Sequence, residues 1–331
     1  MNRGIRPRFY SFDRAQQLAD EFRALLQTFG IDLEPGSSLE RMSLSVADIV
    51  SRRNSPGSRD RMDIRTLFGD QAALTDLAFQ VLQVRDHSNF DQLLGHLRLL
   101  NHGEASQNRP ASQMDQAANK IFELLVACLA MRCGVNIELE PERSSGKKRN
   151  PDVLATIRGR RWGIACKVLH SLNPESVIQN IDKGIDQIEA SEAEVGFVML
   201  NLKNVIDHTR YWTILNLDEW EAGAEPIFSA FPNSMIPVEM LETEVSGIAR
   251  TVGAHVGLDY LTSRFKSVKS LPGILLYAHV VCGVQTQDGR ALPMNQKWPT
   301  WAHVPSLPDF GVEELAVVEC FHRTSQDVPG G

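Results

Sequence analysis

The chain has 331 residues, 43% of them hydrophobic and 23% charged, which fits one large or two moderate globular domains and excludes a disordered or fibrous protein. The formal net charge of -7 argues against a surface that grips nucleic acid everywhere, so any nucleic-acid contact must be local. The five cysteines lack regular spacing, which predicts free thiols and a cytoplasmic protein. No run approaches the ~18 consecutive apolar residues that cross a bilayer, so we expect no membrane partner.

The first hundred residues are predicted to be mainly helical. Apolar residues recur at helical spacing from Phe12 to Leu26, and Gly30 follows in the position of a C-terminal cap. Residues 43–50 fit a short helix or strand, and residues 71–100 predict two helices interrupted near 86–89. The polar stretch 101–112 predicts a domain boundary. We therefore expect a helical N-terminal domain, residues 1–105, with a regulatory or recognition role that includes binding a protein partner.

The second predicted domain, residues 112–331, mixes helices and strands. A strongly apolar helix (114–132) ends before Gly134, and a strand (135–139) and a polar loop (140–150) follow it. Two strands (151–157 and 162–169) joined at Arg158–Arg160 form a hairpin, and a helix (174–191) and a buried strand (195–202) come next. Later segments predict helices at 240–256 and 258–265, strands at 273–284 and 314–321, and a long ordered loop at 285–309. The pattern indicates an α/β fold.

The hairpin carries the residues with chemical potential. Asp152 begins one strand and Lys167 lies in the middle of the next, so a short turn brings both to one side. A charged lysine beside Ile164, Cys166 and Val168 needs a carboxylate partner, a path to water or a catalytic role. The alternative is an edge strand with Lys167 facing solvent.

Pro151-Asp152, a hairpin and then Ala165-Cys166-Lys167 together resemble the core of the PD-(D/E)xK nucleases. The motif of that superfamily is Pro-Asp, a hairpin, Asp or Glu, any residue, and Lys. Its members usually carry a glutamate on the preceding helix, as Glu123 does, and a helix and strand follow the hairpin. The resemblance covers residues 114–204 and implies a restriction-endonuclease-like mixed β-sheet core flanked by helices. The departure is Ala165, which stands where the motif has an acid.

The resemblance also implies a metal site and its substrate contacts. Asp152, Glu123 and the backbone carbonyl of Cys166 would hold Mg²⁺ or Mn²⁺, and Lys167 would orient the attacking water. Gln187, or less favourably Gln179, would approach the site from the following helix, and exposed helix glutamines are an equal alternative. His170 either touches substrate or is a hydrogen-bonded structural histidine. Basic side chains that flank the motif would contact nucleic acid, or else occupy solvated turns: Lys147, Lys148, Arg149, Arg158, Arg160 and Arg161.

The implied function is a metal-dependent endodeoxyribonuclease that serves in restriction or antiphage defence. DNA is the expected partner, and RNA stays open as a substrate. Because Ala165 offers no oxygen ligand, we expect this chain to be silenced, either by an engineered change or as a natural protein that binds without cutting. The alternative function is therefore a non-catalytic nucleic-acid-binding or scaffold protein. Enzymes that cut both strands often pair two subunits, which predicts a homodimer.

Overall fold

A computed structural model of the chain describes residues 11–53, 64–140, 150–214, 228–266, 268–285 and 291–327. It has a mixed α/β fold built on a six-stranded sheet in the order β1-β2-β3-β4-β7-β8. Strands β3, β4 and β7 run parallel, and the other neighbours pair antiparallel. The strands are β1 (Val135–Leu139), β2 (Val153–Ile157), β3 (Arg160–Val168), β4 (Val195–Asn201), β7 (Ser270–Gln285) and β8 (Ala291–His303). A second, two-stranded sheet pairs β5 (Thr213–Ile214) with β6 (Phe228–Ser229).

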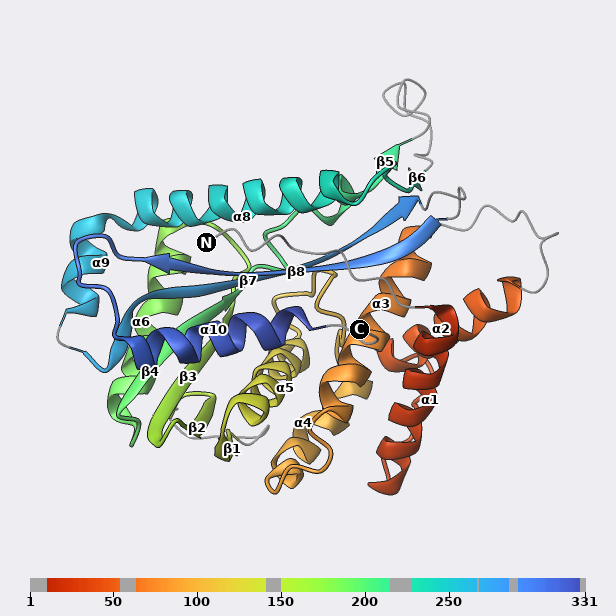
Figure 1. Cartoon of the computed structure of the whole chain (residues 1–331), viewed down its shortest axis with the longest axis horizontal. Coiled ribbons are helices and arrows are strands. Elements are labelled where there is room, and N and C mark those ends of the chain that lie inside the picture. The colour runs from red at the N-terminus through yellow and green to blue at the C-terminus, as the bar shows by residue number, and fades with distance from the viewer. Residues whose placement is uncertain are drawn as a thin grey trace.

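Helices cover both faces of the large sheet (Figure 1). The helices on one side share one hydrophobic core, and α3, α5 and α10 among them contact the strands: α1 (Phe12–Thr28), α2 (Ser38–Arg53), α3 (Ile64–Leu82), α4 (Leu94–Arg98), α5 (Gln116–Cys133) and α10 (Val312–Gln326). The other face packs against α6 (Pro174–Ala190), α8 (Met235–Val256) and α9 (Leu258–Phe265). Short 3-10 helices are η1 (Phe90–Leu93), η2 (Leu99–Asn101) and η3 (His208–Tyr211). Among the described residues, no helix is both long and apolar enough to span a membrane.

The N-terminal helices pack into the same hydrophobic core as α5 and the sheet. Phe22 of α1 and Leu77 of α3 belong to one buried cluster with Phe122 of α5 and Trp162 of β3. Helix α3 also lies against β7 and β8. Residues of the first hundred therefore contact the strands directly.

Local chemistry explains several element boundaries. Ser11 caps α1 by accepting a hydrogen bond from the Arg14 amide, and Gly30, with a φ of 66°, follows the end of that helix. The β2–β3 hairpin turns on Arg158 and Gly159, whose φ angles are 51° and 80°. Two consecutive positive φ values match the twist of a two-residue hairpin. The predicted helix 12–26 and the predicted hairpin are confirmed, and the ambiguous piece 43–50 is helical.

Two predicted elements near the C-terminus are wrong. Residues 314–321 were predicted as a strand but lie inside α10, where Val317, Val318 and Phe321 are buried at helical spacing. Residues 285–309 were predicted as a loop, yet 291–303 form β8, which pairs with β7 along its whole length. The prolines of this segment suggested a loop, but the ladder accommodates Pro293 and Pro299 on its outermost strand.

A disulfide joins two of the cysteines. Cys133 at the end of α5 is bonded to Cys320 of α10, across 187 residues of sequence. The prediction that all five cysteines are free thiols is therefore wrong for this pair. Cys128, Cys166 and Cys282 are free and buried.

Candidate metal centre

The β2–β3 hairpin brings Asp152 and Lys167 into contact. Val153 pairs with Ile164, which sets Asp152 beside the carboxyl half of β3. Lys167 Nζ donates to Asp152 Oδ2 at 2.9 Å, and the Cys166 amide donates to the same oxygen at 2.7 Å. The ammonium also reaches the Cys166 carbonyl oxygen at 3.0 Å. Asp152 is buried, so its carboxylate is held by a fixed set of donors rather than by bulk water.

Three carboxylates from three elements gather at this point. Glu123 projects from α5, Glu140 follows β1, and Asp152 precedes β2; one oxygen of each lies within 4.8 Å of the others. The β1–β2 ladder explains the proximity of two of them, because Leu139 pairs with Val153 and the Glu140 amide donates to the Asp152 carbonyl at 3.0 Å. The sequence prediction placed Glu140 in a polar loop and so missed it. Once Leu139 is paired with Val153, the next pair along the two strands is Glu140 with Asp152, and this register was the signal that could have identified Glu140.

Two further cationic or titratable groups, also missed from the sequence, complete the cluster. Lys120 Nζ lies 2.6 Å from Glu123 Oε2 and 3.3 Å from Glu140 Oε2. His96 Nε2 lies 3.4 Å from the same Glu123 oxygen. Lys120 stands one helical turn before Glu123, whereas His96 comes from α4 and could be placed only by the fold. The centre therefore contains three carboxylates, two ammonium groups and an imidazole.

The pKa shifts in the cluster follow from carboxylates that lie close together and are shielded from water. Burial raises the pKa of Glu123, and the charge of Asp152 raises it further. Burial likewise raises the pKa of the Cys166 thiol well above its usual value, with added contributions from Asp152 and Glu123. A divalent cation would relieve this repulsion, and an all-oxygen carboxylate set is what Mg²⁺ and Mn²⁺ prefer. The residues present fit such an ion.

Position 165 lies on the same face of β3 as Lys167, because side chains alternate along a strand. Ala165 is fully buried in the apolar layer beneath α6, on the opposite face of the sheet from α5. A Cβ added to Gly184 of α6 would lie 3.3 Å from the Ala165 Cβ, so the two elements are in close contact there. Glu140 is the third carboxylate that lies close to Glu123 and Asp152, and the expectation that residue 165 is a vacant ligand position stays a prediction.

Among the described residues, no hydrogen bond joins the other three candidates to the carboxylate cluster. Gln187 of α6 is buried, and its Oε1 has no hydrogen-bond partner among the described residues, whereas Gln179 is exposed. His170 Nδ1 lies 2.9 Å from Asn204 Nδ2 and accepts its hydrogen bond. Burial and the charge of Lys203 lower the pKa of His170. These contacts agree with the structural alternative for this histidine.

The described basic candidates lie at the far end of β3. Arg160 and Lys167 are separated by seven residues of extended strand, roughly 23 Å. Ion pairs join Arg160 to Glu314, and Arg161 to Glu138 and Glu192; the exposed Arg158 sits in the turn beside them. The length of β3 thus separates Arg160 from Lys167 and the end of the strand where Lys167 contacts Asp152. Lys147, Lys148 and Arg149 lie outside the described residues.

Comparison with known proteins finds no matching family model, no similar curated protein and no similar solved structure.

Proposed function

We propose that this chain is a metal-dependent phosphodiesterase of nucleic acids, acting on DNA as an endonuclease of the PD-(D/E)xK type. The observation that carries the proposal is the contact of Lys167 with Asp152, placed against the carboxylates of Glu123 and Glu140. Glu140 contributes the carboxylate that Ala165 lacks. The proposal therefore does not require a change at position 165, and we expect the chain to retain activity.

The roles follow from the chemistry of each group. Asp152, Glu123 and Glu140 would hold Mg²⁺ or Mn²⁺, which supplies charge neutralisation of the phosphate and a more acidic bound water. The Lys167 ammonium would orient the attacking water or stabilise negative charge on the phosphate in the transition state. The Cys166 backbone fixes Asp152 through its amide. The succession of α5, the β2–β3 hairpin, α6 and β4 supports the proposal, because the resemblance implies a helix before the hairpin and a helix and a strand after it.

One observation favours a competing role. Lys120 and Lys167 already contact the three carboxylates, which is how a purely structural ionic cluster neutralises itself. In that case the protein is a non-catalytic scaffold or nucleic-acid-binding protein, and the ammonium of Lys120 takes the place of a metal ion between the carboxylates. The two readings differ in whether a divalent cation binds.

The first test measures both binding and cleavage. We expect the wild-type chain to bind Mn²⁺ in calorimetric titration and to nick supercoiled plasmid DNA in its presence. Asp152→Asn and Glu140→Gln should weaken Mn²⁺ binding and lower the cleavage rate roughly 100-fold or more. Lys167→Ala should lower cleavage as strongly but leave Mn²⁺ bound, because lysine is not a ligand.

Glu192→Gln is the matched control, since it also turns a glutamate into an amide but its side chain is 66% exposed. It should leave both Mn²⁺ binding and cleavage unchanged. A wild-type chain that neither binds Mn²⁺ nor cuts DNA would overturn the proposal and favour the structural cluster. Cleavage that survives in Asp152→Asn would do so as well.

A further inference from the structure

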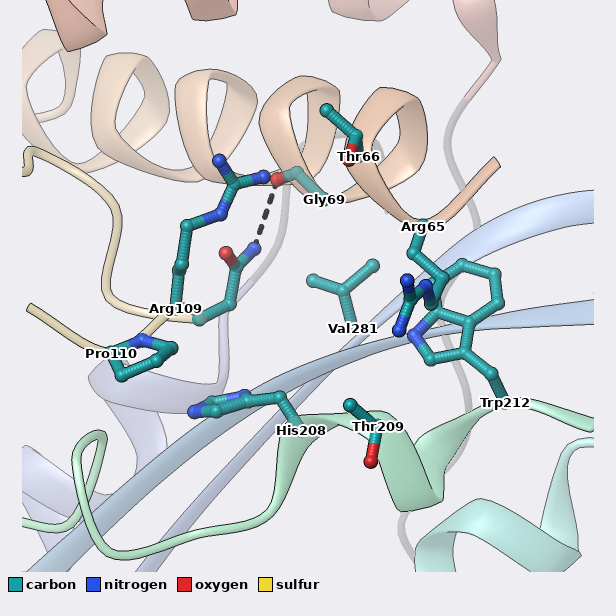
Figure 2. A pocket seen from close by; sticks show the side chains of 10 residues that line it. Arg65, Thr66, Gly69, Arg109, Pro110, His208, Thr209, Trp212 and Val281 are labelled. Atoms are coloured by element: carbon teal, nitrogen blue, oxygen red, sulfur yellow. Dashed lines mark hydrogen bonds between the residues drawn. The ribbon is translucent and has the colours of Figure 1, made fainter. Parts of the chain in front are cut away.

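A cavity of about 170 Å³ opens between α3, residues 108–110, η3 and β7, away from the carboxylate cluster. Figure 2 shows Arg65 and Arg109 on opposite sides of it, with His208 and Thr209 along one border and Val281 behind. Among the described residues that line it, none is Asp or Glu. In a chain with a net charge of -7, such a lining is selective for an anion.

The anion would meet three positive features. Arg65 lies in the first turn of α3, where the helix dipole also favours negative charge. Its guanidinium stacks 3.4 Å from the centre of the Phe228 ring, which fixes its orientation. Arg109 lies 3.0 Å from Asp70, and Arg41, which shares that carboxylate at 3.2 Å, also pairs with Glu104 at 3.1 Å.

The opposite border offers an acceptor. His208 Nε2 lies 2.8 Å from the Lys203 carbonyl oxygen, which requires the proton to be on Nε2. Burial lowers the pKa of His208, so the ring is neutral and Nδ1 carries a lone pair. That Nδ1 is buried and has no hydrogen-bond partner among the described residues. A ligand that satisfies the lining must therefore carry an O–H or N–H donor as well as an anionic group.

From this geometry we propose that the cavity binds one nucleotide unit, with its phosphate between Arg65 and Arg109 and a sugar hydroxyl or base N–H toward His208. The indole of Trp212 and the side chain of Val281 offer apolar surface for the sugar or base. The volume is below the ~300 Å³ of ordinary ligand clefts, which limits the occupant to a single unit. The unit comes either from a free mononucleotide or from a nucleic-acid strand.

The segment 108–111 runs from the cavity toward the end of β3 and makes a hydrogen bond at each end. Asn108 Nδ2 donates to the Gly69 carbonyl at the cavity, and the Ala111 amide donates to Asn204 Oδ1 at 2.7 Å. Asn204 in turn contacts His170, three residues beyond Lys167. His208 and Thr209 of the cavity follow β4, and Lys167 lies near the carboxyl end of β3, which is parallel to β4; open α/β sheets bind ligands at such ends. A strand that reached both would deepen the proposed function, but nucleotide binding does not depend on it.

The test is binding in EDTA, where no metal-dependent cleavage occurs. The probes are dAMP, inorganic phosphate and a single-stranded eight-nucleotide DNA, titrated by calorimetry and by tryptophan fluorescence. We expect dAMP to bind more tightly than phosphate and to change a fluorescence signal that Trp212→Phe removes. Arg65→Gln should weaken binding about tenfold, as the loss of one charge-assisted hydrogen bond does. Arg98→Gln, which removes an exposed arginine of α4, should have no effect.

The outcomes distinguish a nucleic-acid strand from a free mononucleotide as the ligand, and nucleotide binding in the cavity from cleavage at the carboxylate cluster. Oligonucleotide binding that Arg65→Gln weakens and dAMP displaces identifies a strand, whereas binding of dAMP alone identifies a free mononucleotide. The inference fails if neither dAMP nor the oligonucleotide binds, or if Arg65→Gln leaves their binding unchanged. Asp152→Asn should bind all probes as the wild type does, so loss of cleavage in that variant leaves the inference untouched.

Discussion

Ala165 separates two explanations of how the carboxylate cluster is completed. If Glu140 is the third carboxylate, a glutamate at position 165 adds an unpaired charge beneath α6. We expect Ala165→Glu to lower the free energy of unfolding by roughly 3 kcal/mol, from overpacking and charge burial, without raising cleavage. Urea denaturation and the plasmid assay with Mn²⁺ measure the two quantities.

Ala155→Glu is the matched control, because Ala155 is equally buried on the neighbouring strand but packs on the α5 face of the sheet. It should destabilise the protein to a similar degree. A cleavage rate that rises at least tenfold in Ala165→Glu, and not in the control, would show that residue 165 is a ligand position after all. The chain would then be a silenced form, as the motif alone suggests.

Single residues were predictable from the sequence where their neighbours along the chain defined their surroundings. Asp152 and Lys167 flank one short turn, so their contact followed from the hairpin pattern, whereas Glu123 was a candidate because of the resemblance to the PD-(D/E)xK core. Glu140 and His96 could not be found in this way. The position of Glu140 depends on the register of β1 with β2, and that of His96 on how α4 packs against α5.

At the scale of elements, the disulfide is the covalent tie between α5 and α10. The bond from Cys133 to Cys320 closes a loop of 187 residues, and long closed loops restrict the unfolded chain strongly. We expect Cys320→Ser to lower the free energy of unfolding by roughly 2–5 kcal/mol under oxidising conditions. Dithiothreitol should destabilise the wild type to a similar extent and leave the variant unaffected.

The thiol count provides an independent check on this tie. Denatured, unreduced protein should expose the three thiols of Cys128, Cys166 and Cys282 to a thiol reagent. Five reactive thiols, or a wild type whose stability ignores dithiothreitol, would contradict the disulfide.

Element type was predictable where apolar spacing was unambiguous and short-range signals agreed. Helix α1 has a serine cap and a glycine after its end, and the hairpin has a turn that tolerates positive φ at Arg158 and Gly159. Strand β8 was not predictable, because its proline-rich sequence forms a strand only through pairing with β7. The prediction of a strand where α10 lies was wrong for a related reason. A short apolar run fits both the helical and the strand period, and packing against α5 and β8 decides between them.

At the scale of the whole molecule, a buried polar layer joins the N-terminal helices to the long β7–β8 pair. Lys297 of β8 forms an ion pair with Asp76 of α3, and both side chains are almost fully buried. His279 of β7 donates from Nε2 to Asn295 Oδ1 at 3.1 Å, and Asn295 Nδ2 donates to the Ala72 carbonyl of α3. The His279 ring cannot be solvated in the folded protein, so its protonation is coupled to the stability of the helices and sheet that enclose it.

His279 makes that coupling measurable. Burial lowers its pKa to about 4; the charge of Lys297 and the proximity of His208 lower it too, and Asp76 and the bond to Asn295 oppose the shift. In the unfolded chain the pKa is about 6.5. Between these values the unfolded chain binds a proton that the folded protein does not, so stability falls as the pH drops from about 6.5 to about 4. The total loss from this group is about 3 kcal/mol.

The comparison that isolates this contribution is His279→Gln, which keeps a hydrogen-bond donor for Asn295 but cannot take up the proton. Urea denaturation at intervals from pH 7 to pH 4 should give a smaller loss of stability in the variant than in the wild type, by about 3 kcal/mol over the range. His102→Gln, which replaces an exposed histidine, should follow the wild-type curve. Parallel curves for the wild type and His279→Gln would mean that protonation of this buried layer does not govern acid stability, and that other groups do.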